Sequence, residues 1–174
     1  MMITLKQFVL IAVLGAAIGL IVNTVSPNRI DLVGKYRTLS SGEGPIVPPS
    51  AQAGDPPFID INQAQMEFSL GQAIWVDARS PEEFICGTIP GSINIPFDYL
   101  PEGDLRAYFD SAMGNPARDR EVIVFCSGEE CDLSMMLARN LKTYGFTNLL
   151  IFFGGAREWE KFGLELERRG KCGE

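Results

Sequence analysis

The stretch EVIVFCSGEECDLSMMLARNLKTYG, residues 121–145, decides the fold. Its first six residues are rich in β-branched side chains, which is typical of a buried strand. Further along, Leu133, Leu137 and Leu141 recur at the spacing of one helix face, and Gly145 fits the position just after a helix C-terminus. The sequence therefore predicts a strand, a short loop that begins at Cys126, and a helix.

The same alternation of strand and helix continues on both sides of this stretch. Asn62 and Ser80 fit as helix N-caps, and Gly71 fits as a stop signal. Strands with little polar alternation, separated by helices, indicate an α/β fold with a parallel central sheet and helices on both faces. Ligands of such folds bind at the carboxyl ends of the strands, where Cys126 lies. The other predicted strands are residues 73–78, 92–96 and 148–153, and the other predicted helices are 59–71, 80–87, 105–113 and 154–163.

The composition excludes several classes of chemistry. The chain of 174 residues contains no histidine, which excludes Ser-His-Asp catalysis, Cys-His catalysis and zinc sites that need histidine. Its four cysteines form no C-x2-C pair, so we expect no metal and no cofactor. The net charge is −7, and residues 55–174 carry 20 acidic against 11 basic side chains. A surface of that sign repels phosphates, so nucleic-acid binding is not expected.

The N-terminal region predicts a membrane anchor. No charged residue occurs between Lys6 and Arg29, and residues 7–25 are long and apolar enough for a single-pass transmembrane helix. A cleaved signal peptide and a buried core helix are the alternatives. We expect the following domain to face the periplasm.

Composition also predicts the boundaries along the chain. The anchor takes residues 1–28. Residues 29–56 are rich in proline and glycine, which is typical of a semi-extended linker. Residues 57–170 form the predicted α/β domain, and residues 171–174 a short tail.

The loop CSGEEC, residues 126–131, has the features of a thiol site, although a metal site, a disulfide or a phosphate loop also begins with such spacing. Backbone amides of a strand-to-helix loop can point inward, and the helix that starts near Asp132 adds the positive end of its dipole. This cradle would stabilise a thiolate or persulfide at its centre. We therefore expect Cys126 to be nucleophilic at neutral pH without a general base.

Three segments resemble the rhodanese family of sulfurtransferases. They are DARSPEEFICGTIPGSINIP (77–96), VIVFC (122–126) before a six-residue loop, and FFGGAREWEKFGLELE (152–167). They occur in the family's order, and the resemblance covers about residues 57–168. The sequence departs from the family pattern at Thr88, which replaces histidine, at Ser92, which replaces alanine, and at Leu166, which replaces proline.

The resemblance implies a function and its residues. Cys126 would be the nucleophile that takes sulfane sulfur from a small donor or a protein persulfide and, as a persulfide, passes it to a thiophilic acceptor such as a thiol. The resemblance also implies a backbone cradle and a structural framework. The cradle is Ser127, Gly128, Glu129, Glu130 and Cys131, and the framework is Asp77, Arg79, Glu83, Gly91, Trp159 and Gly163.

The loop departs from the family in its charge and in its second cysteine. Glu129, Glu130 and Asp132 stand where many members carry basic residues, so we expect thiosulfate to be a poor donor compared with persulfides, polysulfide or a protein donor. Cys131 is either a resolving thiol, which would form a disulfide with Cys126, or a small loop-filling side chain. Cys86 is expected to be packed, and Cys172 to be exposed without a catalytic role.

A phosphatase and a non-catalytic interaction subunit are the alternatives to a sulfurtransferase. A phosphatase loop of the C-x5-R type needs arginine at position 132, where this chain has aspartate. A non-catalytic, membrane-tethered interaction subunit of a larger complex would use the same fold only as a scaffold. The presence of Cys126 favours catalysis over the scaffold.

Overall fold

The computed structural model describes residues 5–25, 44–128, 131–170 and 172. The chain divides into two units, residues 1–37 and residues 38–174. The first unit contains helix α1 (Leu5–Val25), and the second contains all the strands. Within the described residues, no helix combines the length and the apolar character needed to cross a membrane, so the predicted transmembrane span at residues 7–25 is not confirmed.

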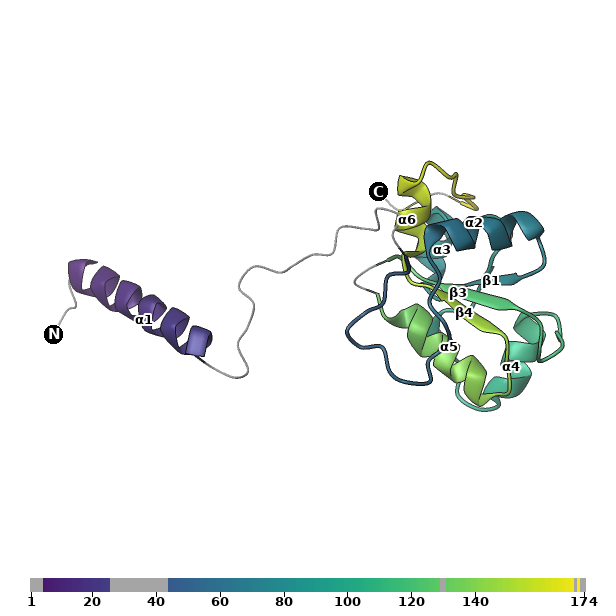
Figure 1. Cartoon of the computed structure of the whole chain (residues 1–174), viewed down its shortest axis with the longest axis horizontal. Coiled ribbons are helices and arrows are strands. Elements are labelled where there is room, and N and C mark those ends of the chain that lie inside the picture. Colours follow the sequence, from purple (N-terminus) through teal and green to yellow (C-terminus); the bar gives the residue numbers. More distant parts are fainter. Residues whose placement is uncertain (1–4, 26–43, 129–130, 171, 173–174) are drawn as a thin grey trace. The chain divides into compact units, whose positions relative to one another are not determined.

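The second unit is built on a four-stranded parallel sheet, as predicted. The strands lie in the order β2-β1-β3-β4, and β3 pairs with β1 and β4 over its full length (Figure 1). Because β3 lies inside the sheet, its carboxyl end is surrounded by the ends of its neighbours. The bounds are Ile74–Asp77 for β1, Ile93–Asn94 for β2, Val122–Phe125 for β3 and Leu149–Phe152 for β4.

Helices cover both faces of the sheet and enclose two cores (Figure 1). The core on one face includes Val122 and Val124 of β3 with residues of α4 (Leu105–Ala112) and α5 (Leu133–Thr143). The core on the other face includes Ile123 and Phe125 with residues of α2 (Ile61–Leu70) and α6 (Gly155–Lys161). Successive β3 side chains point to opposite faces, so a strand that is apolar throughout is buried on both sides.

The helix termini follow local capping chemistry. Helix α3 (Pro81–Cys86) begins as predicted, with Ser80 accepting a hydrogen bond from the Glu83 amide. Helix α2 ends as predicted at Gly71, whose φ of 63° suits glycine. The predicted N-cap Asn62 is wrong, because Asp60 takes that position and accepts from the Gln63 amide. The 3₁₀ turn Phe97–Tyr99 follows β2.

Residues 44–58, most of which were predicted as linker, belong to the second unit and pack against its α/β core. Ile46 is buried in the core that contains α5, and Asp55 forms an ion pair with Arg139 of α5 at 2.7 Å. At the end of the segment, the Ile59 amide donates to the Ile151 carbonyl at 2.9 Å, which places residues 57–59 beside β4. The segment contains two turns, at residues 49–50 and 53–54, and apolar and charged anchors attach it to the domain. Residues 29–43 of the predicted linker lie outside the described residues.

Candidate active site

The site lies where β3 ends. Cys126 directly follows the strand, and its side chain is fully buried. The Ala78 amide, just after β1, donates to the Phe125 carbonyl at 2.9 Å, so the ends of β1 and β3 are held together. The structure thus places Cys126 at the carboxyl edge of the sheet, between two neighbouring strands.

The loop after β3 is held by the turn that precedes α6. The amide of Ala156 donates to the Cys126 carbonyl at 2.9 Å, and the amide of Arg157 donates to the Ser127 carbonyl at 3.2 Å. Gly155 has a φ of 60°, and a Cβ there would collide with the Cys126 carbonyl oxygen. Only glycine allows the two backbones to approach this closely. The G-G pair of the segment 152–167 therefore supports the thiol loop.

The two loop cysteines contact each other. Cys126 Sγ donates to the Cys131 carbonyl at 2.8 Å, and it lies 3.4 Å from the hydroxyl of Ser134 on α5. The Cys131 amide donates to the Gly128 carbonyl at 2.8 Å, which closes the loop. Cys131 is half-buried, whereas Cys126 has no exposed area, so a molecule from solvent meets Cys131 first.

The environment gives the two thiols opposite acidities. Burial raises the pKa of Cys126 well above its usual range, and the interaction with Cys131 acts in the same direction. The hydrogen bond from the Cys126 thiol lowers the pKa of Cys131 to about 6, with further contributions from the Ser127 and Leu133 amides. At neutral pH the pair therefore holds one negative charge, on Cys131. This differs from the expectation of a resting Cys126 thiolate, because burial and the carbonyl of Cys131 oppose charge on that sulfur.

The predicted amide cradle is divided between the two sulfurs. The Gly128 amide stabilises charge on Cys126, and the amides of Ser127 and Leu133 stabilise charge on Cys131. Leu133 is the first residue of α5, so the helix N-terminus acts on Cys131 and not on Cys126, for which it was predicted. Glu129 and Glu130, the other two predicted cradle residues, lie outside the described residues.

This thiol pair predicts the pH dependence of alkylation. The rate of reaction of Cys131 with iodoacetamide should rise as the pH passes 6 and level off near neutrality, because the thiolate is the reactive form. Cys126 should remain unreactive over that range, because burial raises its pKa. Both cysteines lie in the Arg-specific fragment 121–139, in which fragment-ion masses assign the modified residue.

Two variants test the cause of the low Cys131 pKa. Cys126→Ser keeps a hydrogen-bond donor beside Cys131, so the alkylation midpoint should stay near that of the wild type. Cys126→Ala removes the donor, so the midpoint should rise toward that of an ordinary thiol. Equal midpoints in the two variants would contradict the assignment to the Cys126 hydrogen bond.

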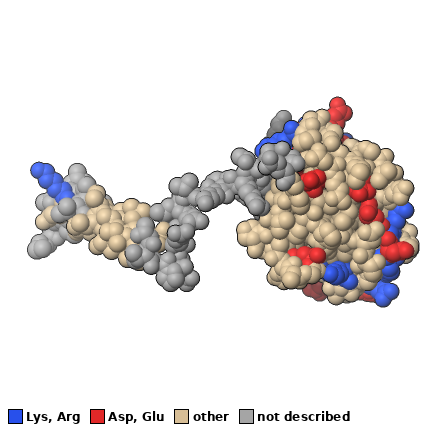
Figure 2. Space-filling model, viewed as in Figure 1, with Lys and Arg blue, Asp and Glu red and all other residues tan. Residues whose placement is uncertain are grey.

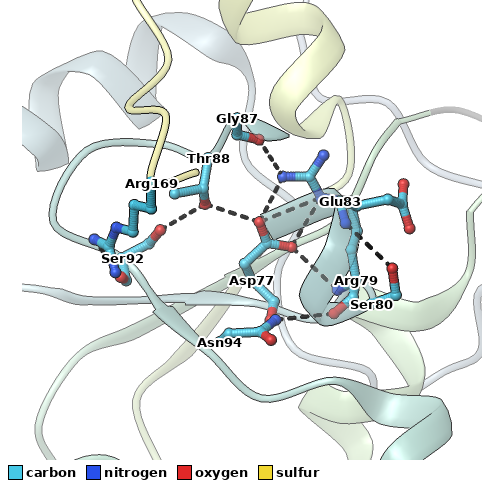
Figure 3. A network of polar contacts seen from close by, with 9 residues as sticks. All are labelled: Asp77, Arg79, Ser80, Glu83, Gly87, Thr88, Ser92, Asn94 and Arg169. Atoms are coloured by element: carbon cyan, nitrogen blue, oxygen red, sulfur yellow. Dashed lines mark hydrogen bonds and ion pairs between the residues drawn. The ribbon is translucent and has the colours of Figure 1, made fainter. Parts of the chain in front are cut away.

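A buried polar network joins β1 to the segment that follows α3 (Figure 3). The Asp77 carboxylate accepts from the Arg79 Nη2 atom at 2.6 Å and from the Thr88 hydroxyl at 2.8 Å. Arg79 also donates to the Gly87 carbonyl at 2.7 Å. Although burial disfavours its charge, the hydrogen bonds to Asp77 raise the pKa of Arg79. Asp77 and Arg79 thus form a fixed ion pair at the edge of the sheet where Cys126 lies.

The network also accounts for two departures from the family pattern. The hydroxyls of Thr88 and Ser92 lie 2.7 Å apart and hydrogen-bond to each other. Because the Thr88 hydroxyl donates to Asp77, it accepts from Ser92, whose buried hydroxyl thereby gains a partner. Histidine at 88 and alanine at 92 would not make this pair.

Sequence reasoning missed two parts of the site. Ser134 was not singled out, although it follows Cys126 by eight residues and starts a predicted helix. The bracing role of Gly155 was also missed, and the signal was the adjacent pair Gly154–Gly155 directly after a strand. The described residues show no cluster of three or more cysteine, aspartate and glutamate side chains that would hold a metal ion.

Acidic and basic side chains are interspersed on the face of the molecule shown in Figure 2. The expected absence of nucleic-acid binding stays a prediction, because surface charge alone does not measure affinity.

Comparison with known proteins finds sulfurtransferases. The sequence pattern of the rhodanese-like domain family matches residues 60–162. The thiosulfate:glutathione sulfurtransferase of Homo sapiens is 34% identical over 110 residues, which cover 59% of this chain and 92% of that protein. The mitochondrial thiosulfate sulfurtransferase RDL2 of Saccharomyces cerevisiae is 29% identical over 132 residues, which cover 71% of this chain and 85% of that protein. The solved structure of the BH2092 protein from Bacillus halodurans matches with a TM-score of 0.55 and 21% identity, over 68% of this chain and 84% of that one, which is a likeness of fold alone.

Proposed function

Because the chain belongs to the rhodanese-like domain family, we propose that it is a sulfurtransferase that carries sulfane sulfur on Cys126 and passes it to a thiophilic acceptor. The observation that carries this proposal is the contact of the buried Cys126 with Cys131 at the carboxyl end of β3, where the Cys126 sulfur lies 2.8 Å from the Cys131 carbonyl oxygen. The lowered pKa of Cys131 keeps a thiolate beside Cys126 at neutral pH in a chain that has no histidine base.

The first step transfers sulfur from the donor to Cys126. The Cys131 thiolate accepts the proton of the Cys126 thiol, and the Cys126 thiolate attacks the outer sulfur of a donor R–S–S⁻. The S–S bond of the donor breaks, RS⁻ leaves with the bonding electrons, and Cys126 becomes a persulfide. The Cys131 thiolate is present at neutral pH to take the proton, but the transfer is uphill, because the pKa of Cys126 is raised and that of Cys131 is lowered; the Cys126 thiolate is therefore a minor species that the reaction with the donor consumes.

The second step has two outcomes that depend on the acceptor. An external thiolate attacks the outer sulfur of the persulfide and releases the Cys126 thiolate. Alternatively, Cys131 attacks the inner sulfur, which releases HS⁻ and forms a Cys126–Cys131 disulfide that a thiol reductant must then reduce. The short contact between the two residues supports Cys131 as the resolving thiol.

Sulfur loading of Cys126 from different donors tests this proposal. Intact-mass spectrometry of the reduced protein after exposure to inorganic polysulfide should show one added sulfur, located on Cys126 in fragment 121–139. Loading from thiosulfate should be slower by about tenfold than loading from an alkyl persulfide R–S–S⁻ at the same concentration, because carboxylates beside the loop repel a dianion more strongly than a monoanion. Absence of a sulfur adduct with any of these donors would instead favour the non-catalytic interaction subunit, and equal loading rates would reject the donor preference alone.

Attachment to a membrane through residues 7–25, with the domain on the periplasmic side, stays a prediction from the sequence. It rests on the uncharged stretch between Lys6 and Arg29. Alkaline carbonate extraction of membranes that contain the full chain tests it, since an integral protein stays in the pellet and a peripheral one is released.

A further inference from the structure

The C-terminal segment of the chain runs along α3. Thr88 and Glu167 form an antiparallel bridge, with N···O distances of 3.0 and 2.8 Å. The Arg169 amide donates to the Ile85 carbonyl at 2.9 Å, and the Arg169 guanidinium lies over the Phe84 ring at 4.7 Å from its centre. These contacts fix the direction of the chain as it leaves the domain.

This docking brings the two cysteines outside the thiol loop together. Cys172 Sγ lies 3.5 Å from the carbonyl oxygen of Cys86, the last residue of α3, although the residues are 86 positions apart in the chain. Neither cysteine is in a disulfide; Cys172 is exposed and Cys86 is half-buried. The contact is therefore a product of the fold, and it places the Cys172 sulfur beside the backbone of Cys86.

We propose that Cys86 and Cys172 are a second redox site, which closes reversibly into a disulfide when the protein meets a low-molecular-weight disulfide. The exposed Cys172 thiolate attacks the oxidant RSSR, which forms a mixed disulfide and releases one RS⁻. The Cys86 thiolate then attacks the Cys172 sulfur and displaces the second RS⁻. The two cysteines lose two electrons in total, and the oxidant gains them.

The position of Cys86 gives this bond a structural consequence. Cys86 lines a cavity of about 250 Å³, together with Arg79 and Arg157. The amide of Arg157 also binds the Ser127 carbonyl in the thiol loop. A Cys86–Cys172 disulfide would fix the end of the chain at the wall of this cavity, and reduction would release it. The second pair thus lies at a surface that adjoins the thiol loop.

Arg-specific cleavage separates the two cysteine pairs and makes the experiment direct. The reduced full chain is oxidised with glutathione disulfide, its remaining thiols are blocked, and it is digested without reductant. Cys86 lies in fragment 80–106 and Cys172 in fragment 170–174, whereas Cys126 and Cys131 share fragment 121–139. We expect fragments 80–106 and 170–174 to be recovered joined, and a reductant to separate them.

The controls are the two single variants and the unfolded chain. Cys172→Ser changes only an exposed side chain and should abolish the joined fragments, while fragment 121–139 behaves as in the wild type. Cys86→Ser should leave Cys172 as a stable mixed disulfide with glutathione. In urea, oxidation should link Cys172 to several partners, because docking on α3 is lost. Recovery of Cys172 from the native wild type mainly as the glutathione adduct, or linked to other cysteines as often as to Cys86, would overturn the proposal. Because no sulfur donor is used, this result is independent of the sulfur-transfer test.

Discussion

Replacing Cys126 by serine is expected to reduce sulfur transfer by about a thousand-fold or more, because the persulfide can no longer form. The substitution keeps the size of the side chain and a hydrogen-bond donor that faces the Cys131 carbonyl and the Ser134 hydroxyl. The loop geometry should therefore survive while the chemistry is lost. Transfer of sulfur from polysulfide to a small thiol, followed by the product persulfide, measures the effect.

The matched variant is Cys131→Ser, which removes the partner thiol but leaves Cys126 in place. Sulfur loading of Cys126 should become slower by about ten- to a hundred-fold, because the thiolate that accepts the Cys126 proton is absent. Release of sulfide without an external thiol should stop, because no resolving thiol remains. Full activity of Cys126→Ser, with inactivity of Cys131→Ser, would show that the sulfur is carried by Cys131 instead.

The sequence was sufficient to predict the sheet and most of the helix ends. The β-branched run before Cys126 and the Ser80–Pro81 helix start are local signals, and local interactions decide both features. The observed N-cap of α2, Asp60, differs from the predicted Asn62 because both residue types are good caps. The choice between them depends on the burial of Ile61 in the core. A local pattern cannot contain that information.

Of the candidate site, the sequence predicted the position of Cys126 but not the charge distribution around its sulfur. The strand-to-helix spacing placed Cys126 at the carboxyl edge of the sheet, where the structure has it. The charge distribution between Cys126 and Cys131 depends on the direction of a carbonyl and of three amides, and on burial by distant segments. Likewise, the contact of Cys86 with Cys172 depends on how the end of the chain docks on α3. These are tertiary effects, which periodicity and composition do not report.

Replacing Asp77 by alanine is expected to lower the free energy of unfolding by about 3 to 5 kcal/mol, the typical cost of breaking a buried ion pair from one side. Asp77 is fully buried and Arg79 is 6% exposed, so solvent does not compensate the guanidinium that remains. The substitution also removes the acceptor of the Thr88 hydroxyl (Figure 3). Urea unfolding followed by the fluorescence of the buried Trp75 and Trp159 measures the change.

Two matched variants assign that loss to buried charge. Asp77→Asn keeps the shape and an acceptor for Thr88 but not the charge, so its stability should lie between those of the wild type and the alanine variant. Glu167→Ala breaks the ion pair between Glu167 and Arg169. The Glu167 side chain is 40% exposed and the Arg169 side chain is 35% exposed. Its effect should be much smaller, because water screens that pair and solvates the arginine left behind. If Asp77→Ala and Glu167→Ala destabilised the domain equally, the Asp77–Arg79 pair would not be the buried electrostatic support that positions the edge of the sheet beside Cys126.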